Sequence, residues 1–217
     1  MEDRRQFIKK ITSLFSGITI LSGILPQFLK SLFGEESNIL LAGGYMDRDS
    51  LKAVSQNDIA SRRVHVTPLR SFGVMGVTDI KVAKDEWNLE IKSREGNLIK
   101  YSYDDILRLP PVEKEVVLTC PGFFENYGLW KGFSLGSIIK EKGLAEEIKK
   151  VEISGLNGRK DISYKFPLKS VLNDHIFLAY GVNRETLPMR NGFPLRAVAQ
   201  GYYGSHWVKY VNRVTML

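Results

Sequence analysis

The chain has 217 residues, of which 43% are hydrophobic and 25% charged, a composition typical of a folded globular protein with a sizeable core. Its net charge is +7, but Lys and Arg are scattered without a basic run, which argues against a nucleic-acid partner. A single cysteine excludes an intramolecular disulfide, although many exported proteins also lack one.

The first 34 residues have the organisation of an export segment. Basic residues precede an uncharged stretch from Ile11 to Leu29, which is just long enough to span a bilayer. The run Arg4-Arg5-Gln6-Phe7-Ile8-Lys9 resembles a twin-arginine signal, with Asp3 where Ser or Thr is usual. We expect residues 1–34 to be a twin-arginine signal or membrane anchor that uses the twin-arginine export machinery. We expect the protein to be exported to the periplasm or another extracytoplasmic location, where this segment can anchor it to the membrane. A buried or amphipathic first helix is the alternative.

Residues 35–63 are polar and mixed in charge, and we interpret them as a linker to a single folded domain at 64–217. In that domain, alternation of apolar and polar residues on both sides of a turn predicts a hairpin over 87–101, and helix start and stop residues predict helices over 103–109 and 134–140. We predict further strands over 115–119, 150–154, 162–166, 176–180, 195–199 and 207–216. Short strands with a few short helices predict an α+β fold with mixed sheets and disfavour a doubly wound one.

Cys120 follows an apolar run and precedes Pro121 and Gly122. Because Pro121 cannot continue a strand ladder and Gly122 tolerates turn angles, we predict that the thiol lies at a strand exit, where sites are commonly built. A buried structural cysteine is the alternative.

Three further segments carry residues that suit a large anionic cofactor: 155–158, 191–196 and 201–209. Their glycines allow close backbone approach. Arg196 can hold a phosphate through two parallel hydrogen bonds, and Lys209 can add a point charge. Taken singly, each segment also fits an ordinary turn or a solvated face.

In this order and spacing, the segments resemble the molybdopterin-binding domain of the sulfite oxidase family. The resemblance covers roughly residues 70–215 and is carried by 117–120, 129–135, 178–183, 187–188, 191–196 and 207–209. The stretch from Arg70 to Val74 resembles the family's opening motif, with Gly73 where proline is common. The resemblance implies a sulfite-oxidase-type fold and a molybdenum-molybdopterin cofactor, and sequence does not distinguish molybdenum from tungsten.

The resemblance also implies the role of individual residues. It makes Cys120 the catalytic thiolate ligand of the metal, while the cofactor supplies two further sulfurs. The cofactor-binding positions that it implies are Asn157, Asn191, Arg196, Trp207, Val208 and Lys209.

Members of this family move an oxygen atom to or from a small-molecule substrate, here sulfite, a sulfoxide or a similar compound. Sulfite needs an anion pocket, for which the candidates are Arg70, Arg184 and Arg190; a sulfoxide suits an aromatic mouth, for which the candidates are Tyr127, Tyr202 and Tyr203. Of these, we select Arg70, Arg190 and Tyr202 as substrate residues.

The sequence given ends soon after Lys209, so we expect no counterpart of the C-terminal dimerisation domain of sulfite oxidases. We also expect no haem-binding domain. We therefore expect a monomer that exchanges electrons with a separate redox partner, a membrane cytochrome or a quinone-linked protein. In its length the chain resembles the stand-alone bacterial members of the family, including periplasmic methionine sulfoxide reductases.

Two other classes of function remain open. A cysteine hydrolase would use Cys120 as nucleophile and His175 or His206 as base, although no local signature supports it. A membrane-anchored binding module would keep the fold without turnover. Bound metal and pterin distinguish the main interpretation from both.

Overall fold

The computed structural model describes residues 66–158 and 160–217, which lie in one compact unit. The expected export segment at 1–34 and linker at 35–63 lie outside these residues, so both stay predictions. No helix within the described ranges is long and apolar enough to cross a membrane.

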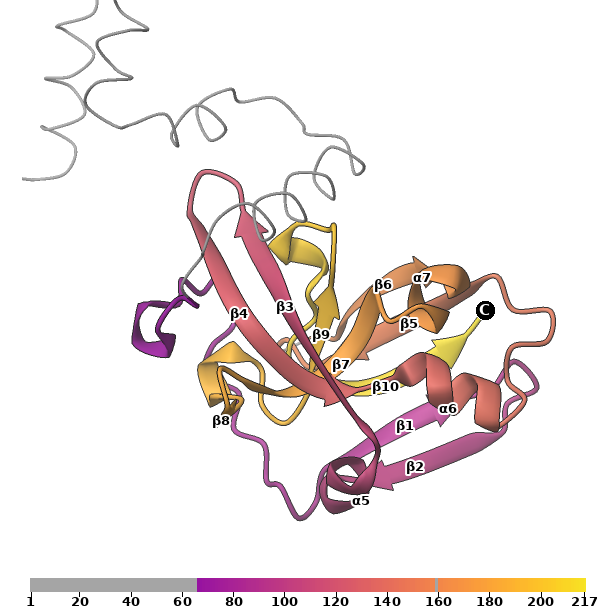
Figure 1. Ribbon diagram of the computed structural model, residues 1–217. Helices are drawn as coiled ribbons and strands as arrows, with labels where there is room; N and C mark the ends of the chain where they lie inside the picture. Colours follow the sequence, from indigo (N-terminus) through magenta and orange to yellow (C-terminus); the bar gives the residue numbers. More distant parts are fainter. Residues whose placement is uncertain (1–65, 159) are drawn as a thin grey trace, which may run out of the picture. The chain divides into compact units, whose positions relative to one another are not determined.

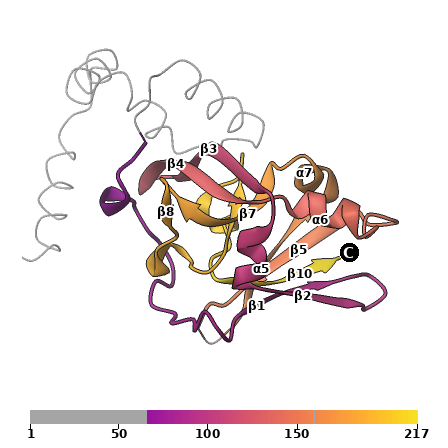
Figure 2. The ribbon, with the colours of Figure 1, turned by 60° about the horizontal axis from the view of Figure 1, so that its bottom comes forward.

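The first of two five-stranded sheets has the order β2-β1-β10-β5-β6. Its strands are β1 (Asn88–Lys92), β2 (Leu98–Ser102), β5 (Lys150–Gly155), β6 (Ile162–Pro167) and β10 (Val211–Met216). β1 runs parallel to β10, and the other neighbours are antiparallel. The last strand of the chain therefore lies between two hairpins, as Figures 1 and 2 show.

The second sheet has the order β3-β4-β7-β8, with β9 paired to β7. Its strands are β3 (Pro111–Cys120), β4 (Phe124–Phe133), β7 (Ile176–Val182), β8 (Glu185–Thr186) and β9 (Arg196–Ala199). β3 and β4 form a long antiparallel hairpin in which Cys120 pairs with Phe124 at the tip. In Figure 1 this tip extends away from the first sheet.

Short helices connect the strands: α5 (Tyr103–Arg108), α6 (Leu135–Glu141), α7 (Leu168–Leu172) and the 3-10 turns η2 (Leu69–Ser71), η3 (Met189–Asn191) and η4 (Gly204–His206). α5 begins at a capping box formed by Ser102 and Asp105. α6 begins where the Ser134 hydroxyl accepts the Ser137 N–H at 2.9 Å. α6 packs against α7 and β7.

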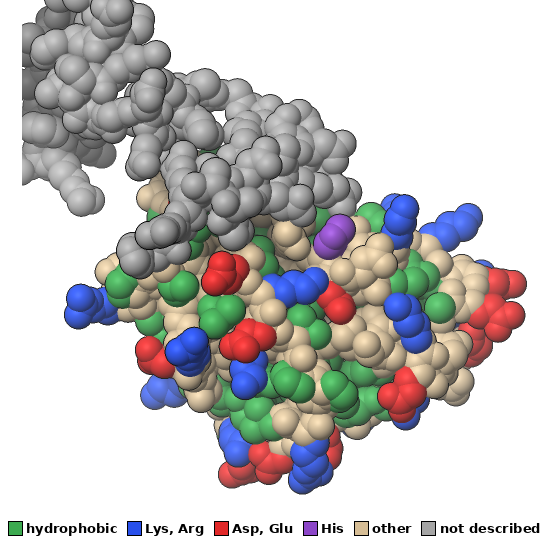
Figure 3. Space-filling model, in the orientation of Figure 1, with side chains coloured by type: hydrophobic (Ala, Val, Ile, Leu, Met, Phe, Trp, Pro, Cys, Tyr) green, Lys and Arg blue, Asp and Glu red, His purple; other side chains and the backbone are tan. Residues whose placement is uncertain are grey.

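One hydrophobic core joins both sheets and the helices. Its largest fully buried side chains include Trp130, Phe133, Phe166, Phe177 and Trp207. On the described part of the face in Figure 3, Lys and Arg side chains are interspersed with Asp and Glu. This face therefore presents no single-sign surface of the kind that binds nucleic acids.

The α+β prediction is confirmed, as are the hairpin, the helices that α5 and α6 form, and the predicted strands up to residue 199. The expected strand over 207–216 is wrong in its first half, because Tyr210 has a φ of 53°, and β10 begins only at Val211. β4 was not among the predicted strands, because glycines weaken a strand pattern. Gly132 is needed there, since a Cβ would overlap the Leu178 carbonyl of β7.

Candidate active site

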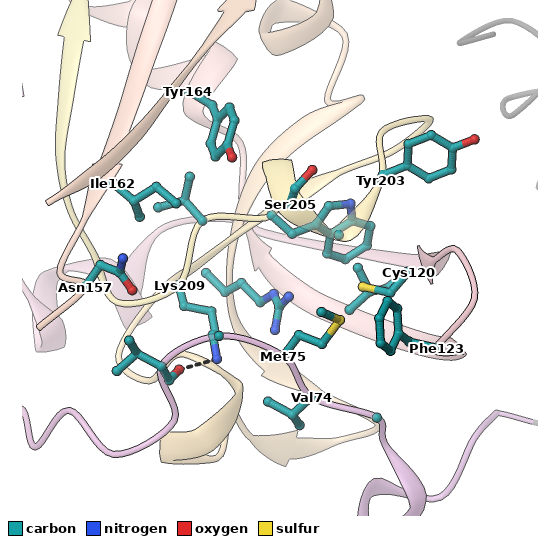
Figure 4. Close-up of a pocket in the computed structure, with 18 of the residues that line it drawn as sticks. Val74, Met75, Cys120, Phe123, Asn157, Ile162, Tyr164, Tyr203, Ser205 and Lys209 are labelled. Atoms are coloured by element: carbon teal, nitrogen blue, oxygen red, sulfur yellow. Dashed lines mark hydrogen bonds between the residues drawn. The ribbon is translucent and has the colours of Figure 1, made fainter. Parts of the chain in front are cut away.

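A cavity of about 480 Å³ brings together segments that are far apart in the sequence. Its walls come from the tip of the β3–β4 hairpin, the turn after β5, residues 203–210 and a strap that we define as residues 73–77. Six predicted site residues line it: Cys120, Asn157, Arg196, Trp207, Val208 and Lys209. Figure 4 shows side chains of several of these segments around it.

Cys120 is the last residue of β3 and is half-buried, so its predicted place at a strand exit is confirmed. The turn is closed by the Phe123 N–H, which donates to the Cys120 carbonyl at 3.0 Å, and Gly122 takes a φ of 78°. A Cβ at Gly204 would overlap the Cys120 Sγ, so a larger residue there would displace this sulfur from its present position. Burial raises the pKa of the thiol, while the charge of Arg196 and the Gly204 N–H act in the opposite direction.

Arg196 begins β9 and is a buried cation, 6% exposed. Its guanidinium carbon lies 5.7 Å from the ring centroids of both Trp130 and Trp207. Its Nη1 donates to the Asn191 carbonyl at 2.9 Å, while its Nε has no hydrogen-bond partner among the described residues. No carboxylate among the described residues forms an ion pair with Arg196, and burial lowers its pKa to about 10.

Lys209 is the second cation of the cavity. Its ammonium donates to the Val77 carbonyl of the strap and to the Arg190 carbonyl at 3.3 Å (Figure 4 shows the first contact). Burial and then the neighbouring charge of Arg196 lower its pKa to about 8. Two adjacent cations without a carboxylate partner in the described chain are costly to bury, so the cavity is suited to an anion.

Asn157 and Asn191 occupy different positions. Asn157 is exposed, on the turn after β5, and lines the cavity. Asn191 is 1% exposed and does not line it. Its carbonyl accepts a hydrogen bond from Arg196, and its Oδ1 has no hydrogen-bond partner within the part of the chain that the structure describes. Asn191 is therefore placed to position the guanidinium, while Asn157 can contact a ligand directly.

The three candidate arginines of an anion pocket lie elsewhere. Arg70, Arg184 and Arg190 line a second cavity of about 790 Å³, beside the start of the described chain and the β7–β8 turn. The Arg190 Nη2 donates to the Leu69 carbonyl at 3.0 Å, and the Asn183 Nδ2 donates to the Thr67 carbonyl at 2.9 Å. These bonds dock Leu69 against η3 and Thr67 against the β7–β8 turn, and the three candidate arginines lie outside the lining of the Cys120 cavity.

Tyr202 also lies outside the lining of the Cys120 cavity. Its ring packs on Phe166 at 5.3 Å and on His206 at 5.2 Å. Of the three aromatic candidates, Tyr203 lines the cavity, while Tyr127 and the selected Tyr202 do not.

Two side chains at the cavity were not predicted from the sequence, Met75 of the strap and Phe123 of the hairpin tip. Both are large, apolar and exposed. Phe123 stands three residues after the cysteine, a signal that could have drawn attention to it. Met75 carries no such signal, since its position depends on how the strap folds back.

The sequence of this site matches a known family. Residues 74–217 match the oxidoreductase molybdopterin binding domain. The chain belongs to this family. It is accordingly a molybdopterin-dependent oxidoreductase of the sulfite oxidase family, and molybdopterin is its cofactor.

Relatives of known name share about a quarter of their aligned residues with it. The chain is 28% identical over 148 residues to the uncharacterized oxidoreductase YuiH of Bacillus subtilis, covering 65% of this chain and 73% of that protein. It is 25% identical to the protein-methionine-sulfoxide reductase catalytic subunit MsrP of Gluconobacter oxydans, and the match covers 60% of this chain and 47% of that protein. It is 28% identical to human mitochondrial sulfite oxidase, and the match covers 56% of this chain and 27% of that protein.

The fold has a counterpart among solved structures. The sulfane dehydrogenase SoxCD of Paracoccus pantotrophus superposes with a TM-score of 0.58 at 23% identity, covering 63% of this chain and 39% of that one. This match confirms the sulfite-oxidase-type fold.

Proposed function

We propose that the chain reduces an uncharged S-oxide or similar oxide, removing its oxygen atom at the molybdenum site. The observation that carries this proposal is the placement of charge. Among the described residues that line the Cys120 cavity, the charged ones are Arg196 and Lys209, both suited to the cofactor's phosphate. Met75, Phe123, Phe124 and Tyr203 give the rest of the mouth an apolar and aromatic character, which favours an uncharged substrate over sulfite.

The residues of this chain fit molybdopterin. The Cys120 thiol offers a donor to the metal, and Gly204 leaves space around it. The unpaired Arg196 and Lys209 match an anionic phosphate, and Arg196 also has an unused Nε donor. Asn157 offers an amide to the polar edge of a pterin. When bound, this cofactor supplies the oxygen-atom exchange and the two-electron redox chemistry.

The chain's own groups hold and tune that site. Because burial raises the pKa of Cys120, metal binding must release its proton, and the Gly204 N–H and Arg196 then favour the resulting thiolate. Asn191, Trp130 and Trp207 hold the guanidinium of Arg196 in place. Met75 and Phe123 give one side of the mouth an apolar surface that a bound substrate would cover.

The proposed reaction consumes two electrons and two protons and releases the reduced substrate and water. The electrons would come from a separate redox partner, a membrane cytochrome or quinone-linked protein, in agreement with the term catalytic subunit in the name of MsrP. The twin-arginine resemblance of residues 1–34 supports a periplasmic location, because that route exports proteins already folded around a cofactor.

A cysteine hydrolase is disfavoured by the electrostatics of the thiol. Such a nucleophile needs a lowered pKa, whereas burial raises that of Cys120. His206 stacks on Tyr164 at 4.6 Å and lies outside the cavity lining.

The test is a paired assay of the purified, molybdopterin-loaded full chain, with molybdenum measured by mass spectrometry. We expect oxidation of reduced benzyl viologen by methyl p-tolyl sulfoxide and by dimethyl sulfoxide, and little reduction of ferricyanide by sulfite. Sulfite oxidation without S-oxide reduction would overturn the proposal. A loaded protein inactive in both assays would favour the binding-module alternative.

A further inference from the structure

Two of the exposed large hydrophobic side chains in the described chain lie at one cavity. Met75 is 48% exposed and Phe123 is 72% exposed, and both line the cavity that contains Cys120. In Figure 4 they lie on the same side of the cavity as the cysteine, while Asn157 and Ile162 lie on the other. Leu98 and Leu107 are similarly exposed, at 49% and 45%, but lie on β2 and α5 and line neither described cavity.

The segments that carry Met75 and Phe123 are held in fixed positions. The Gly73 N–H donates to the Asn126 Oδ1 at 2.9 Å, and the Asn126 Nδ2 donates to the Gly73 carbonyl at 2.9 Å. Asn126 belongs to β4, the strand that continues from the hairpin tip. The ring of Phe124 fills the space where Gly73 would carry a Cβ. Gly73, two residues before Met75, therefore contacts Phe124, the residue directly after Phe123. These contacts hold the strap against the hairpin tip.

We propose that Met75 and Phe123 form an apolar clamp that determines substrate specificity by holding the hydrophobic substituent of the oxide beside the metal. This inference rests on the proposed function for the identity of the oxide. The clamp presents a thioether from one segment and an aromatic ring from another, and both surfaces are exposed to solvent before substrate binds. Covering them with an aryl or long alkyl substituent removes apolar surface from water, and a small substituent removes little.

The clamp therefore predicts discrimination by size and hydrophobicity. Methyl p-tolyl sulfoxide can cover both side chains with its ring, whereas dimethyl sulfoxide has only methyl groups to place there. One aromatic or thioether contact of this kind is worth about tenfold in kcat/KM, within the range of apolar pocket contacts.

The test measures binding as well as turnover, in the molybdopterin-loaded full chain. Methyl p-tolyl sulfone serves as a non-reducible probe, and its Kd is measured by calorimetry for wild type, Met75→Ala, Phe123→Ala, Phe123→Leu and the control Leu107→Ala. We expect the Kd of the sulfone to rise about tenfold in Met75→Ala and in Phe123→Ala, and to rise less than threefold in Phe123→Leu and Leu107→Ala. The ratio of kcat/KM for methyl p-tolyl sulfoxide to that for dimethyl sulfoxide should fall by the same factor.

The outcomes separate the two proposals. Equal Kd values in wild type, Met75→Ala and Phe123→Ala, or no measurable binding to wild type, would overturn the clamp. Phe123-dependent sulfone binding without reduction of any S-oxide would support the clamp and overturn the reductase function. Molybdenum content and the unfolding midpoint, measured on every variant, show that the exposed substitutions leave the loaded fold intact.

Discussion

The side-chain amide of Asn126 satisfies both backbone polar groups of Gly73, at 2.9 Å in each direction. Asn126 is 1% exposed and pairs with Leu118 in the β3–β4 hairpin. Leu118 lies two residues before Cys120 on β3. One buried amide thus couples the strap over the cavity to the hairpin that presents the thiol.

Replacing Asn126 with Leu should detach the strap. The change removes two hydrogen bonds and leaves the Gly73 N–H and carbonyl without these partners, so we expect a loss of about 2–4 kcal/mol in the free energy of unfolding. Urea unfolding of the cofactor-free chain measures it. Asn88→Ala is the control, because that amide makes one exposed bond at 3.3 Å to the Glu86 carbonyl. A loss below about 0.5 kcal/mol in Asn126→Leu would show that the Asn126–Gly73 hydrogen bonds do not hold the strap.

The family's proline should not be tolerated at position 73. Proline lacks the N–H that Gly73 donates to Asn126, and its ring atoms would overlap Phe124. We expect Gly73→Pro to lower the free energy of unfolding by about 3 kcal/mol. The comparison variant is Gly76→Ala in the same strap, where the added Cβ meets no atom within 4 Å and the cost comes from the φ of +74°. A Gly73→Pro variant as stable as wild type would show that the strap can rearrange.

The local signals in the sequence were sufficient to place the thiol. The Pro121-Gly122 pair after an apolar run predicted a strand exit at Cys120, and the structure has one. The Pro110-Pro111 pair likewise located the end of α5, and the capping residue Ser134 located the start of α6. Arg196 and Lys209 could be assigned to one anion site because the family resemblance supplied the tertiary arrangement that no local pattern encodes.

Residues whose role depends on how loops dock were not predictable in this way. Arg70 lies in a stretch that resembles the family's opening motif, yet its neighbour Leu69 in η2 accepts a hydrogen bond from Arg190, and the Arg70 side chain lines the second cavity. Met75 and Phe123 are ordinary apolar residues in sequence, and only their convergence at the cavity gives them a proposed role. Tyr202 and Tyr203 are adjacent and identical in type, so the backbone path alone decides which lines the cavity.

Replacing Arg196 with Met should separate stability from cofactor retention. Removing a buried cation that has no carboxylate partner should leave the cofactor-free chain equally stable or stabilise it by up to about 2 kcal/mol, despite loss of the bond to Asn191. Molybdopterin content after purification should fall about thirtyfold or more, since the phosphate loses a buried charge partner. Arg213→Met is the control, because Arg213 is an exposed arginine on β10. Full pterin content in Arg196→Met would exclude Arg196 from the cofactor site.

Replacing Cys120 with Ser should abolish turnover while the fold survives. Serine keeps the size of the side chain and the contact with Gly204 but lacks the thiolate donor. We expect activity at the assay background and loss of the thiolate-to-metal absorption, with pterin still retained through Arg196 and Lys209. Absorption spectra and pterin analysis measure this, with Thr119→Ser as the control. Full activity in Cys120→Ser would disprove the ligand role.

Anion binding by the cofactor-free chain should weaken as the pH rises through 8. The pKa of Lys209 is lowered to about 8, so its ammonium is charged at pH 7 and mostly neutral at pH 9. Arg196, with a pKa of about 10, stays charged across this range, and burial raises the pKa of Cys120, which moves ionisation of the thiol to higher pH. Sulfate keeps its own charge between pH 7 and 9, which makes it the suitable probe.

An anion favours the protonated lysine, so the association constant for sulfate should fall about tenfold between pH 7 and pH 9, as expected for one linked proton. Calorimetric titrations at pH 7, 8 and 9 measure it. In Lys209→Met the binding should be weaker at pH 7 and nearly independent of pH, because the titrating ammonium is gone. If wild type and Lys209→Met showed the same pH dependence, another group would control the anion site, and Lys209 would be left with its structural contacts to Val77 and Arg190.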